Sequence, residues 1–210
     1  MTVRVELMPE QTTINESALV LQAQAGDLKS FSALVEIYQE RAVTVAYSFL
    51  GNFEDARDLA QEAFIRAHEK ISTFKAESRF YTWFYRILAN LCKDFLRKKK
   101  VRKTISFFTG GGEEDGTEDA SARVPSRAKD AGAILVNEEL GERILKAMER
   151  LPFQQKSVFA LRYLEELSLA EIAESLKLSE GAVKAHLWQA GQKMKKSLGD
   201  YLQPEGRGPK

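Results

Sequence analysis

The sequence predicts an all-α protein built from two helical domains that are joined by a flexible acidic linker. Apolar residues recur at helical spacing through most of the chain, and the alternating pattern typical of strands is absent. A glycine-rich acidic stretch interrupts this periodicity near the middle. The length of 210 residues exceeds the size of about 100–150 residues that is commonest for one domain. We therefore expect domains at residues 14–103 and 134–202, a linker at residues 104–133, and tails at residues 1–13 and 203–210.

Composition argues against several classes of protein. Cys92 is the only cysteine, which excludes a disulfide framework and a thiolate zinc site and fits a reducing cytoplasm. His68 and His186 lie far apart and no glycine-rich phosphate loop is present, so no catalytic group, metal site or cofactor site is expected. No window offers the roughly 18 apolar residues of a membrane span, and the N-terminus lacks the apolar core of a signal peptide. We expect a cytoplasmic, non-enzymatic protein without direct membrane insertion.

Helix start and stop signals predict three helices in the first third of the chain. Asn15 is a candidate N-cap for the first helix, which is expected to stop at Gly26. Gly51 is expected to end the second helix. These signals predict helices that end at residue 25, that span about residues 28–50, and that span about residues 54–74.

The fourth predicted helix begins after Ser78, a candidate N-cap, and has the sharpest helical periodicity of the chain. Its apolar stripe, most of which is expected to lie in the core, consists of Phe80, Trp83, Phe84, Ile87, Leu88, Leu91 and Phe95. Tyr81, Tyr85 and Asn90 fall off this stripe. Aromatic and amide side chains beside a basic helix end are typical of a surface for single-stranded nucleic acid, where bases stack on rings and lysines hold phosphates.

The formal net charge of +1 conceals a strong separation of charge along the chain. Residues 86–103 carry eight Lys and Arg residues against Asp94 alone. Residues 104–122 carry no Lys or Arg and five carboxylates, which are Glu113, Glu114, Asp115, Glu118 and Asp119. This acidic, glycine-containing run cannot bury enough apolar surface to order itself, so a flexible linker is predicted. The linker is either a solvated spacer or a functional segment.

Residues 167–198 have the pattern of a helix-turn-helix, in which the second helix places side chains in the DNA major groove. Ser168 and Glu171 form the signature of a capping box for the first helix, and Ser179 is a candidate cap for the second. Lys177 stands at the turn position usually filled by glycine, where a left-handed conformation costs a non-glycine residue roughly 1–2 kcal/mol. The apolar row of the second helix consists of Val183, Leu187, Ala190, Met194 and Leu198. The alternative is an ordinary helical hairpin with a solvated charged face.

Two longer segments resemble parts of one known family. The segment from Asp55 to Lys100, DARDLAQEAFIRAHEKISTFKAESRFYTWFYRILANLCKDFLRKKK, resembles region 2 of the extracytoplasmic-function sigma factors, the small bacterial promoter-recognition subunits of RNA polymerase. The segment from Leu151 to Leu198, LPFQQKSVFALRYLEELSLAEIAESLKLSEGAVKAHLWQAGQKMKKSL, resembles their region 4. The resemblance implies a protein that binds core RNA polymerase and promoter DNA, recognising the −35 element as duplex and the −10 element as melted DNA. It also implies an anti-sigma factor as a partner.

The resemblance implies roles for individual residues. Those that match the helix docking on the clamp of the largest polymerase subunit are Asp58, Gln61, Glu62, Phe64 and Arg66. Those that match the −10 loop and its neighbouring helix are Lys75, Ala76, Glu77, Ser78, Arg79 and Asn90, beside which we place Tyr81. Those that match the −35 reading positions are Lys184, Ala185, Trp188 and Gln189. From charge alone, we expect phosphate contacts at Arg97, Lys98, Lys99 and Lys100.

The chain departs from the family after the recognition turn. Ala185, His186 and Gln189 stand where the family commonly has an arginine-bearing run, so fewer bidentate guanine contacts are expected. Two other classes of protein remain as alternatives. One is a stand-alone activator with a response-regulator type of helix-turn-helix, although the strands and acidic pocket of a receiver domain are missing. The other is a helical inhibitor that binds polymerase and never reads DNA.

Overall fold

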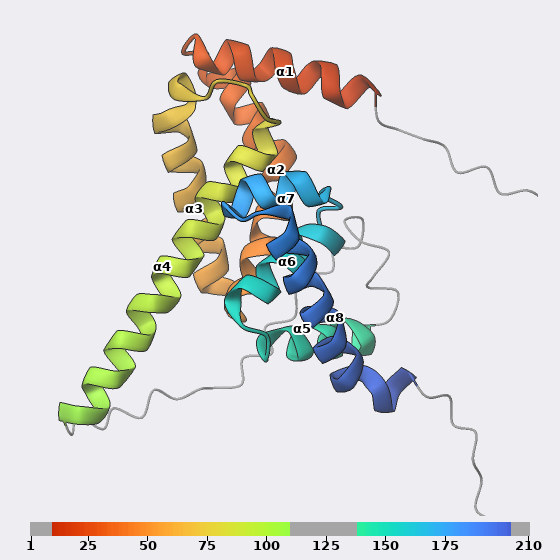
Figure 1. The fold of residues 1–210 in the computed structure, drawn as a ribbon. Helices are drawn as coiled ribbons and strands as arrows, with labels where there is room; N and C mark the ends of the chain where they lie inside the picture. The colour runs from red at the N-terminus through yellow and green to blue at the C-terminus, as the bar shows by residue number, and fades with distance from the viewer. Residues whose placement is uncertain (1–9, 110–137, 203–210) are drawn as a thin grey trace, which may run out of the picture.

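The computed structural model describes residues 10–109 and 138–202, and these residues form helices and connecting turns without a strand (Figure 1). The predicted all-α fold class is confirmed. The N-terminal half consists of α1 (Glu10–Gln24), α2 (Leu28–Leu50), α3 (Phe53–Lys70), the 3₁₀ helix η1 (Ile71–Thr73) and α4 (Phe80–Thr109). The C-terminal half consists of α5 (Glu138–Glu149), α6 (Phe153–Tyr163), α7 (Leu169–Leu176) and α8 (Glu180–Leu202). None of the described helices is long and apolar enough to cross a membrane.

Local capping explains why α2 begins and ends where the sequence predicts. The Asp27 carboxylate accepts hydrogen bonds from the backbone N–H groups of Lys29 and Ser30, which have no partner inside the helix. At the other end, Gly51 adopts a left-handed conformation with φ of 71° and donates its N–H to the carbonyl of Tyr47. Glycine takes this conformation without a steric cost, so the helix stops there.

Four predicted boundaries were wrong. Asn15 lies inside α1, which begins at Glu10, so it is not the N-cap. Ser78 does not cap α4 either, because that helix begins at Phe80 and the carbonyl of Arg79 accepts from the N–H groups of Thr82 and Trp83. The α3 helix ends at Lys70 and gives way to η1, short of the predicted end. Lastly, α4 continues to Thr109 into the segment predicted as linker, of which residues 110–133 lie outside the described residues.

Aromatic side chains form the centre of the N-terminal half. Phe64 on α3 stacks on Phe84 of α4, with ring centroids 4.4 Å apart and planes at 26°. Phe80 and Phe74 meet edge to face near the start of α4. The predicted core stripe of α4 is confirmed at most positions, since Phe80, Phe84, Leu88 and Leu91 are buried. These contacts fix the position of α4, which carries most of the candidate residues for single-stranded DNA.

The two halves pack directly against each other and share one hydrophobic core. The α7 helix lies against α4, while α5 and α6 lie against α2 (Figure 1). Phe49 of α2 and Phe153 of α6 form an edge-to-face pair across this contact, with centroids 5.5 Å apart. Lys156 of α6 is buried nearby, and its ammonium donates to the carbonyl of Phe49 over 3.4 Å. The described parts of the chain are therefore held together by direct packing as well as by the connecting segment.

Candidate nucleic-acid interface

The helix-turn-helix forms as its local signals predict. The Ser168 hydroxyl accepts from the N–H of Glu171, and the Glu171 carboxylate accepts from the N–H of Ser168, which completes the capping box of α7. Lys177 ends α7 in a left-handed conformation, with φ of 53° and ψ of 49°. The Ser179 hydroxyl accepts from the N–H of Ala182 and caps α8. The turn therefore has the left-handed geometry that glycine usually provides, here adopted by a lysine.

One face of α8 is buried and the opposite face is open. Val183, Ala190 and Met194 are buried against the rest of the C-terminal half. The four predicted −35 residues are all exposed and share the free side of the helix: Lys184, Ala185, Trp188 and Gln189. Trp188 is 67% exposed, an unusual state for so large an apolar side chain. The amide of Gln155 donates to the side-chain oxygen of Gln189 over 2.7 Å and orients it.

The predicted −10 loop connects η1 to α4. Lys75, Ala76, Glu77 and Arg79 are exposed and Ser78 is half-buried, so the loop presents its side chains to solvent. Ala76 has a positive φ of 54°, which turns the chain sharply.

A side chain of α1 that sequence reasoning missed holds the segment before this loop. The Gln24 amide donates to the carbonyls of Ile71 and Phe74, over 3.1 Å and 2.5 Å. The Ile71 carbonyl also accepts from the Phe74 N–H within η1, whereas the Phe74 carbonyl lies just past the end of η1. Gln24 thereby fixes the direction from which the loop leaves the core.

The polar side chains of α4 divide into exposed and covered groups. Asn90 is exposed, as a DNA contact requires, and Tyr81 is half-buried. The prediction of Tyr85 as a stacking surface was wrong, because the residue is 1% exposed and its hydroxyl donates to Glu165 of the C-terminal half. Sequence spacing placed Tyr85 off the apolar stripe, but that side of α4 is covered by the C-terminal half.

The basic end of α4 projects from the body of the molecule (Figure 1). All four predicted phosphate-binding residues are exposed: Arg97, Lys98, Lys99 and Lys100. Arg97 pairs with Asp94 at 3.3 Å and Lys99 with Asp55 at 3.4 Å. Exposed ion pairs of this kind contribute little to stability, about 0–1 kcal/mol, so phosphates can replace these carboxylates.

The residues predicted to bind polymerase all lie on α3, and all except Phe64 lie on its open face. Asp58 and Gln61 are exposed, and Glu62 pairs with Arg66 at 2.8 Å on the same open face. Phe64 is different, because it is buried against Phe84 in the core. Its place in the structure is a packing position rather than a docking surface.

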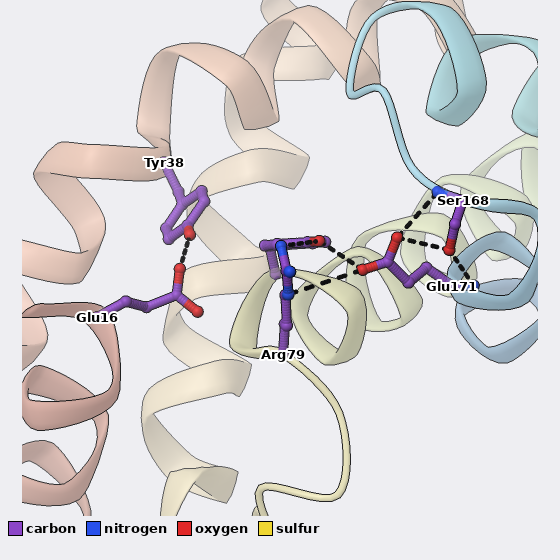
Figure 2. Close-up of polar contacts among 6 residues, drawn as sticks. Glu16, Tyr38, Arg79, Ser168 and Glu171 are labelled. Carbon is purple, nitrogen blue, oxygen red and sulfur yellow. Dashed lines mark hydrogen bonds and ion pairs between the residues drawn. The ribbon is translucent and has the colours of Figure 1, made fainter. Parts of the chain in front are cut away.

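Glu171 connects the helix-turn-helix to the −10 residues (Figure 2). One carboxylate oxygen accepts from Ser168 in the capping box, and the other accepts from the Tyr81 hydroxyl over 2.6 Å. Arg79 lies 3.9 Å from this second oxygen and donates to the Tyr81 hydroxyl over 3.1 Å. Burial and the bond to Glu171 raise the pKa of Tyr81 to about 12, so the hydroxyl remains a donor. Partial burial opposes ionisation of Glu171, but the bonds from Tyr81 and Ser168 outweigh it and lower the pKa of this carboxyl.

Further polar contacts cross between the halves. Arg86 donates to the carbonyl of Glu174 over 3.0 Å and to its carboxylate over 3.3 Å. Glu165 pairs with Arg41 at 2.8 Å and accepts a short hydrogen bond from Tyr85. No sequence signal identifies Arg41 or Glu165, because neither belongs to a motif and their partners are remote in the chain. Within the described residues, no group of three or more His, Cys, Asp or Glu side chains could hold a metal ion.

Comparison with known proteins places both halves in one family. The sequence matches the family description "Sigma-70 region 2" over residues 34–102 and "Sigma-70, region 4" over residues 141–194. It is 36% identical over 181 residues to the "ECF RNA polymerase sigma factor SigW" of Bacillus subtilis strain 168, a match that covers 86% of this chain and 95% of that protein.

Two solved structures share the fold. The "Structure of CnrH in complex with the cytosolic domain of CnrY" aligns with a TM-score of 0.63 at 22% identity, covering 90% of this chain and 99% of that one. The sigma factor RpoE of Bartonella quintana, solved in complex with the anti-sigma factor NepR, aligns with a TM-score of 0.60 at 18% identity, covering 82% of this chain and 98% of that one. At these identities the likeness concerns the fold alone.

Proposed function

Because this chain belongs to the extracytoplasmic-function sigma factors of RNA polymerase, we propose that its two halves divide promoter recognition between them. The chain binds core RNA polymerase and directs promoter-specific transcription initiation, recognising the −35 element as duplex and the −10 element as melted DNA. Sigma factors are non-enzymatic regulators, and we assign this chain no catalytic step of its own. The proposed domains are residues 14–103 and 134–202.

The single observation that carries the −35 assignment is the open face of α8. A recognition helix must bury one side and present donors on the other, with its first turns at base edges. Val183 is buried while Lys184 is exposed, so adjacent residues of the first turns have the two required environments. We assign −35 reading to Lys184, Ala185, Trp188 and Gln189.

The −10 assignment rests on the exposed loop before α4 and the polar side chains of α4. Extruding a base costs a few kcal/mol of unstacking, which a polar pocket and a stacking ring must offset. We assign this role to Lys75, Ala76, Glu77, Ser78, Arg79, Tyr81 and Asn90, with phosphate contacts from Arg97, Lys98, Lys99 and Lys100. The exposure of the loop and of the basic end of α4 supports the assignment.

The polymerase contact is assigned to the open face of α3. Asp58, Gln61, Glu62 and Arg66 are the residues of that face, and Phe64 supports it from within. We also propose an anti-sigma factor as a partner, because the similar RpoE of Bartonella quintana was solved with one. We place the protein in the cell interior, where RNA polymerase acts.

Transcription reconstituted from purified parts tests the proposal. Core RNA polymerase with this chain is given a template library with random sequence upstream of a reporter cassette. We expect transcripts that start at defined positions and that share two upstream sequence blocks. Random starts, or starts that do not depend on the added chain, would overturn the proposal and favour a polymerase-binding inhibitor.

A further inference from the structure

The side chain of Gln189 is exposed on α8, but one end of its amide is held by the protein. Its oxygen, Oε1, accepts a hydrogen bond from the amide nitrogen of Gln155 on α6 over 2.7 Å. The α6 and α8 helices pack against each other, so the two residues meet although they lie 34 positions apart in the chain (Figure 1). No other side chain among the described residues bonds to this amide. The nitrogen of Gln189, Nε2, is therefore the end left free.

Gln155 reaches α8 because it is buried and makes no capping bond in its own helix. It is 8% exposed, so close packing limits the rotamers of its side chain. It is the third residue of α6, a position at which Gln can accept from the N–H of the N-cap residue. The N-cap of α6 is Pro152, which has no N–H to donate. The amide of Gln155 is therefore available to Gln189.

The orientation of the Gln155 amide follows from what burial costs each of its ends. Its oxygen is buried and has no hydrogen-bond partner among the described residues. If the amide were rotated by a half-turn, the oxygen would face Gln189, and the NH₂ group would be the buried group without a partner. Buried N–H donors without a partner are rarer in proteins than buried carbonyl oxygens without one. Gln155 therefore donates and Gln189 accepts.

The bond matters because a Gln side chain can read DNA in two ways. A free amide binds adenine with both ends, since its oxygen accepts from N6 and its nitrogen donates to N7. An amide whose oxygen is drawn toward a buried partner offers the groove its nitrogen, which carries two donors. Guanine presents two acceptors in the major groove, N7 and O6. Cytosine presents a donor, N4, which another donor cannot bind.

We infer that Gln155 is a positioning residue for −35 recognition, which holds the Gln189 oxygen so that the nitrogen selects a base with acceptors, guanine above all. The inference rests on the proposed function of α8. Lys184 is exposed on the same free side of α8 and also has donors only. The −35 surface is therefore matched to base edges that are rich in acceptors.

Reconstituted transcription tests the inference, with random bases confined to the −35 block of the template. The position read by Gln189 is the one at which Gln189→Ala removes the preference for a base. Wild type, Gln155→Leu and Gln155→Glu are compared at that position. Leucine removes the bond and occupies a similar volume, whereas an ionised glutamate replaces the donor by acceptors. Gln154→Leu is the matched control, because Gln154 is the adjacent residue of α6 and is half-buried.

We expect guanine at this position in the wild type and in Gln154→Leu. In Gln155→Leu the ratio of adenine to guanine should rise about five-fold, as expected for one hydrogen bond, because the freed amide binds adenine with both ends. In Gln155→Glu the carboxylate accepts from the Gln189 nitrogen, so the Gln189 oxygen faces the groove. The preference should then move to cytosine or adenine, which offer donors. Each shift should disappear when Gln189→Ala is added.

Two readouts separate positioning from stability. A variant that is merely less stable should lower the transcript yield from every template equally and leave the base preference unchanged. A measurement without DNA follows the bond itself, namely hydrogen exchange of the Gln155 side-chain amide in the full chain, recorded by NMR. This exchange should be slow in the wild type and faster in Gln189→Ala, which removes the acceptor.

Unchanged base preference in Gln155→Leu would overturn the inference and make Gln155 a packing residue. Adenine or cytosine at this position in the wild type, or equal amide exchange in the wild type and Gln189→Ala, would also overturn it. A shift that persists in the Gln189→Ala background, or that Gln154→Leu reproduces, would show that the effect does not pass through Gln189. If no −35 block is recovered, the proposed function fails and the base preference fails with it. A block recovered with unchanged preferences contradicts the inference alone.

Discussion

Arg41 and Glu165 form an ion pair of 2.8 Å that joins α2 to the turn before α7. The two ends of this pair differ in environment, since the carboxylate side chain is 2% exposed and the guanidinium 42%. Water can therefore solvate the Arg41 guanidinium, but it does not reach the Glu165 carboxylate. Loss of Arg41 would leave the buried Glu165 carboxylate without its ionic partner, so a substitution at Arg41 alone is expected to weaken the contact between the halves.

Replacing Arg41 by Gln should destabilise the packing of the N-terminal half against the C-terminal half. Removing one partner of a buried pair costs about 3–5 kcal/mol, and the partial exposure of Arg41 places this pair below that range. We expect a lower melting temperature by calorimetry. Glu165→Gln should cost less, because a neutral amide of the same shape can remain buried with Tyr85. A larger loss for Glu165→Gln than for Arg41→Gln would contradict this account.

The contact should respond to pH through Glu165. Burial, which outweighs the charge of Arg41 and the bond from Tyr85, raises the pKa of this carboxyl above its ordinary value of 4.5. Arg41 on α2, Tyr85 on α4 and Glu166 in the same turn are the charged or titratable groups around it. The folded chain therefore binds this proton more tightly than the unfolded chain does. The stability of the folded chain increases as pH falls from the raised pKa toward 4.5, and this contribution is lost as pH rises through the raised pKa.

Denaturant titration of the full chain at several mildly acidic pH values checks this expectation. The free energy of unfolding of the wild type should increase as the solution is acidified, and Glu165→Gln should flatten this response. Glu171 contributes in the opposite sense. Because its pKa is lowered, its contribution to stability is present above pH 4.5 and is lost only as the pH falls below that value. An identical pH response in the wild type and in Glu165→Gln would assign the effect to another group.

Lys177→Gly should stabilise the C-terminal half. Relief of the left-handed strain is worth roughly 1–2 kcal/mol, and the greater freedom of glycine in the unfolded chain costs about 0.4–1 kcal/mol. We expect a net gain of up to about 1.6 kcal/mol in the free energy of unfolding, measured by denaturant titration. Lys177→Ala is the control, since it removes the charge and keeps the Cβ atom. Equal effects of the two substitutions would show that charge, not backbone strain, limits the turn.

Lys184→Ala should relax the choice of base at one −35 position. If the ammonium meets a base edge, its loss reduces discrimination there by about 1–3 kcal/mol. Transcription by the reconstituted holoenzyme from templates with single −35 substitutions measures this loss. Lys195→Ala, also exposed on α8, is the control. Equal loss on every −35 template would make Lys184 a phosphate contact.

Gln24→Leu should impair −10 recognition without touching DNA. The substitution removes two hydrogen bonds, worth about 0.5–1.5 kcal/mol each, from the carbonyls of Ile71 and Phe74. We expect weaker discrimination against −10 substitutions and unchanged discrimination at −35, both measured by holoenzyme transcription. Gln39→Leu on the exposed side of α2 is the control. A uniform loss at both promoter elements would indicate general destabilisation.

Local sequence signals predicted helix boundaries correctly where a capping residue or a glycine determines the boundary by itself. Gly51 and Ser168 set helix boundaries by their own backbone chemistry, so the sequence was sufficient there. The prediction of Asn15 as an N-cap was wrong because asparagine also occurs inside helices, and only the packing of α1 determines where that helix begins. The predicted start of α4 was wrong for a similar reason, because Ser78 lies one residue too far from Phe80 to be the N-cap of that helix.

Remote contacts explain the errors at the candidate site. Tyr85 and Phe64 have the residue types expected of a binding surface, but partners from other elements bury them. Helical periodicity identifies which residues share a face and cannot identify what covers that face. The pairing of Glu165 with Arg41 could not be predicted for the same reason, because the two residues belong to surfaces that meet only after folding.

The contacts of the Glu171 carboxylate with both Ser168 and Tyr81 restrict how the chain can evolve. One oxygen starts α7 and the other reaches Tyr81, so a substitution at this position changes the folding of the helix-turn-helix and its contact with α4 at once. Aspartate is too short to make both bonds, and glutamine has only one oxygen to accept them. Mutations that weaken the contact between the halves without disturbing the start of α7 are therefore expected to arise at Glu174, whose carboxylate pairs with Arg86 near the end of that helix.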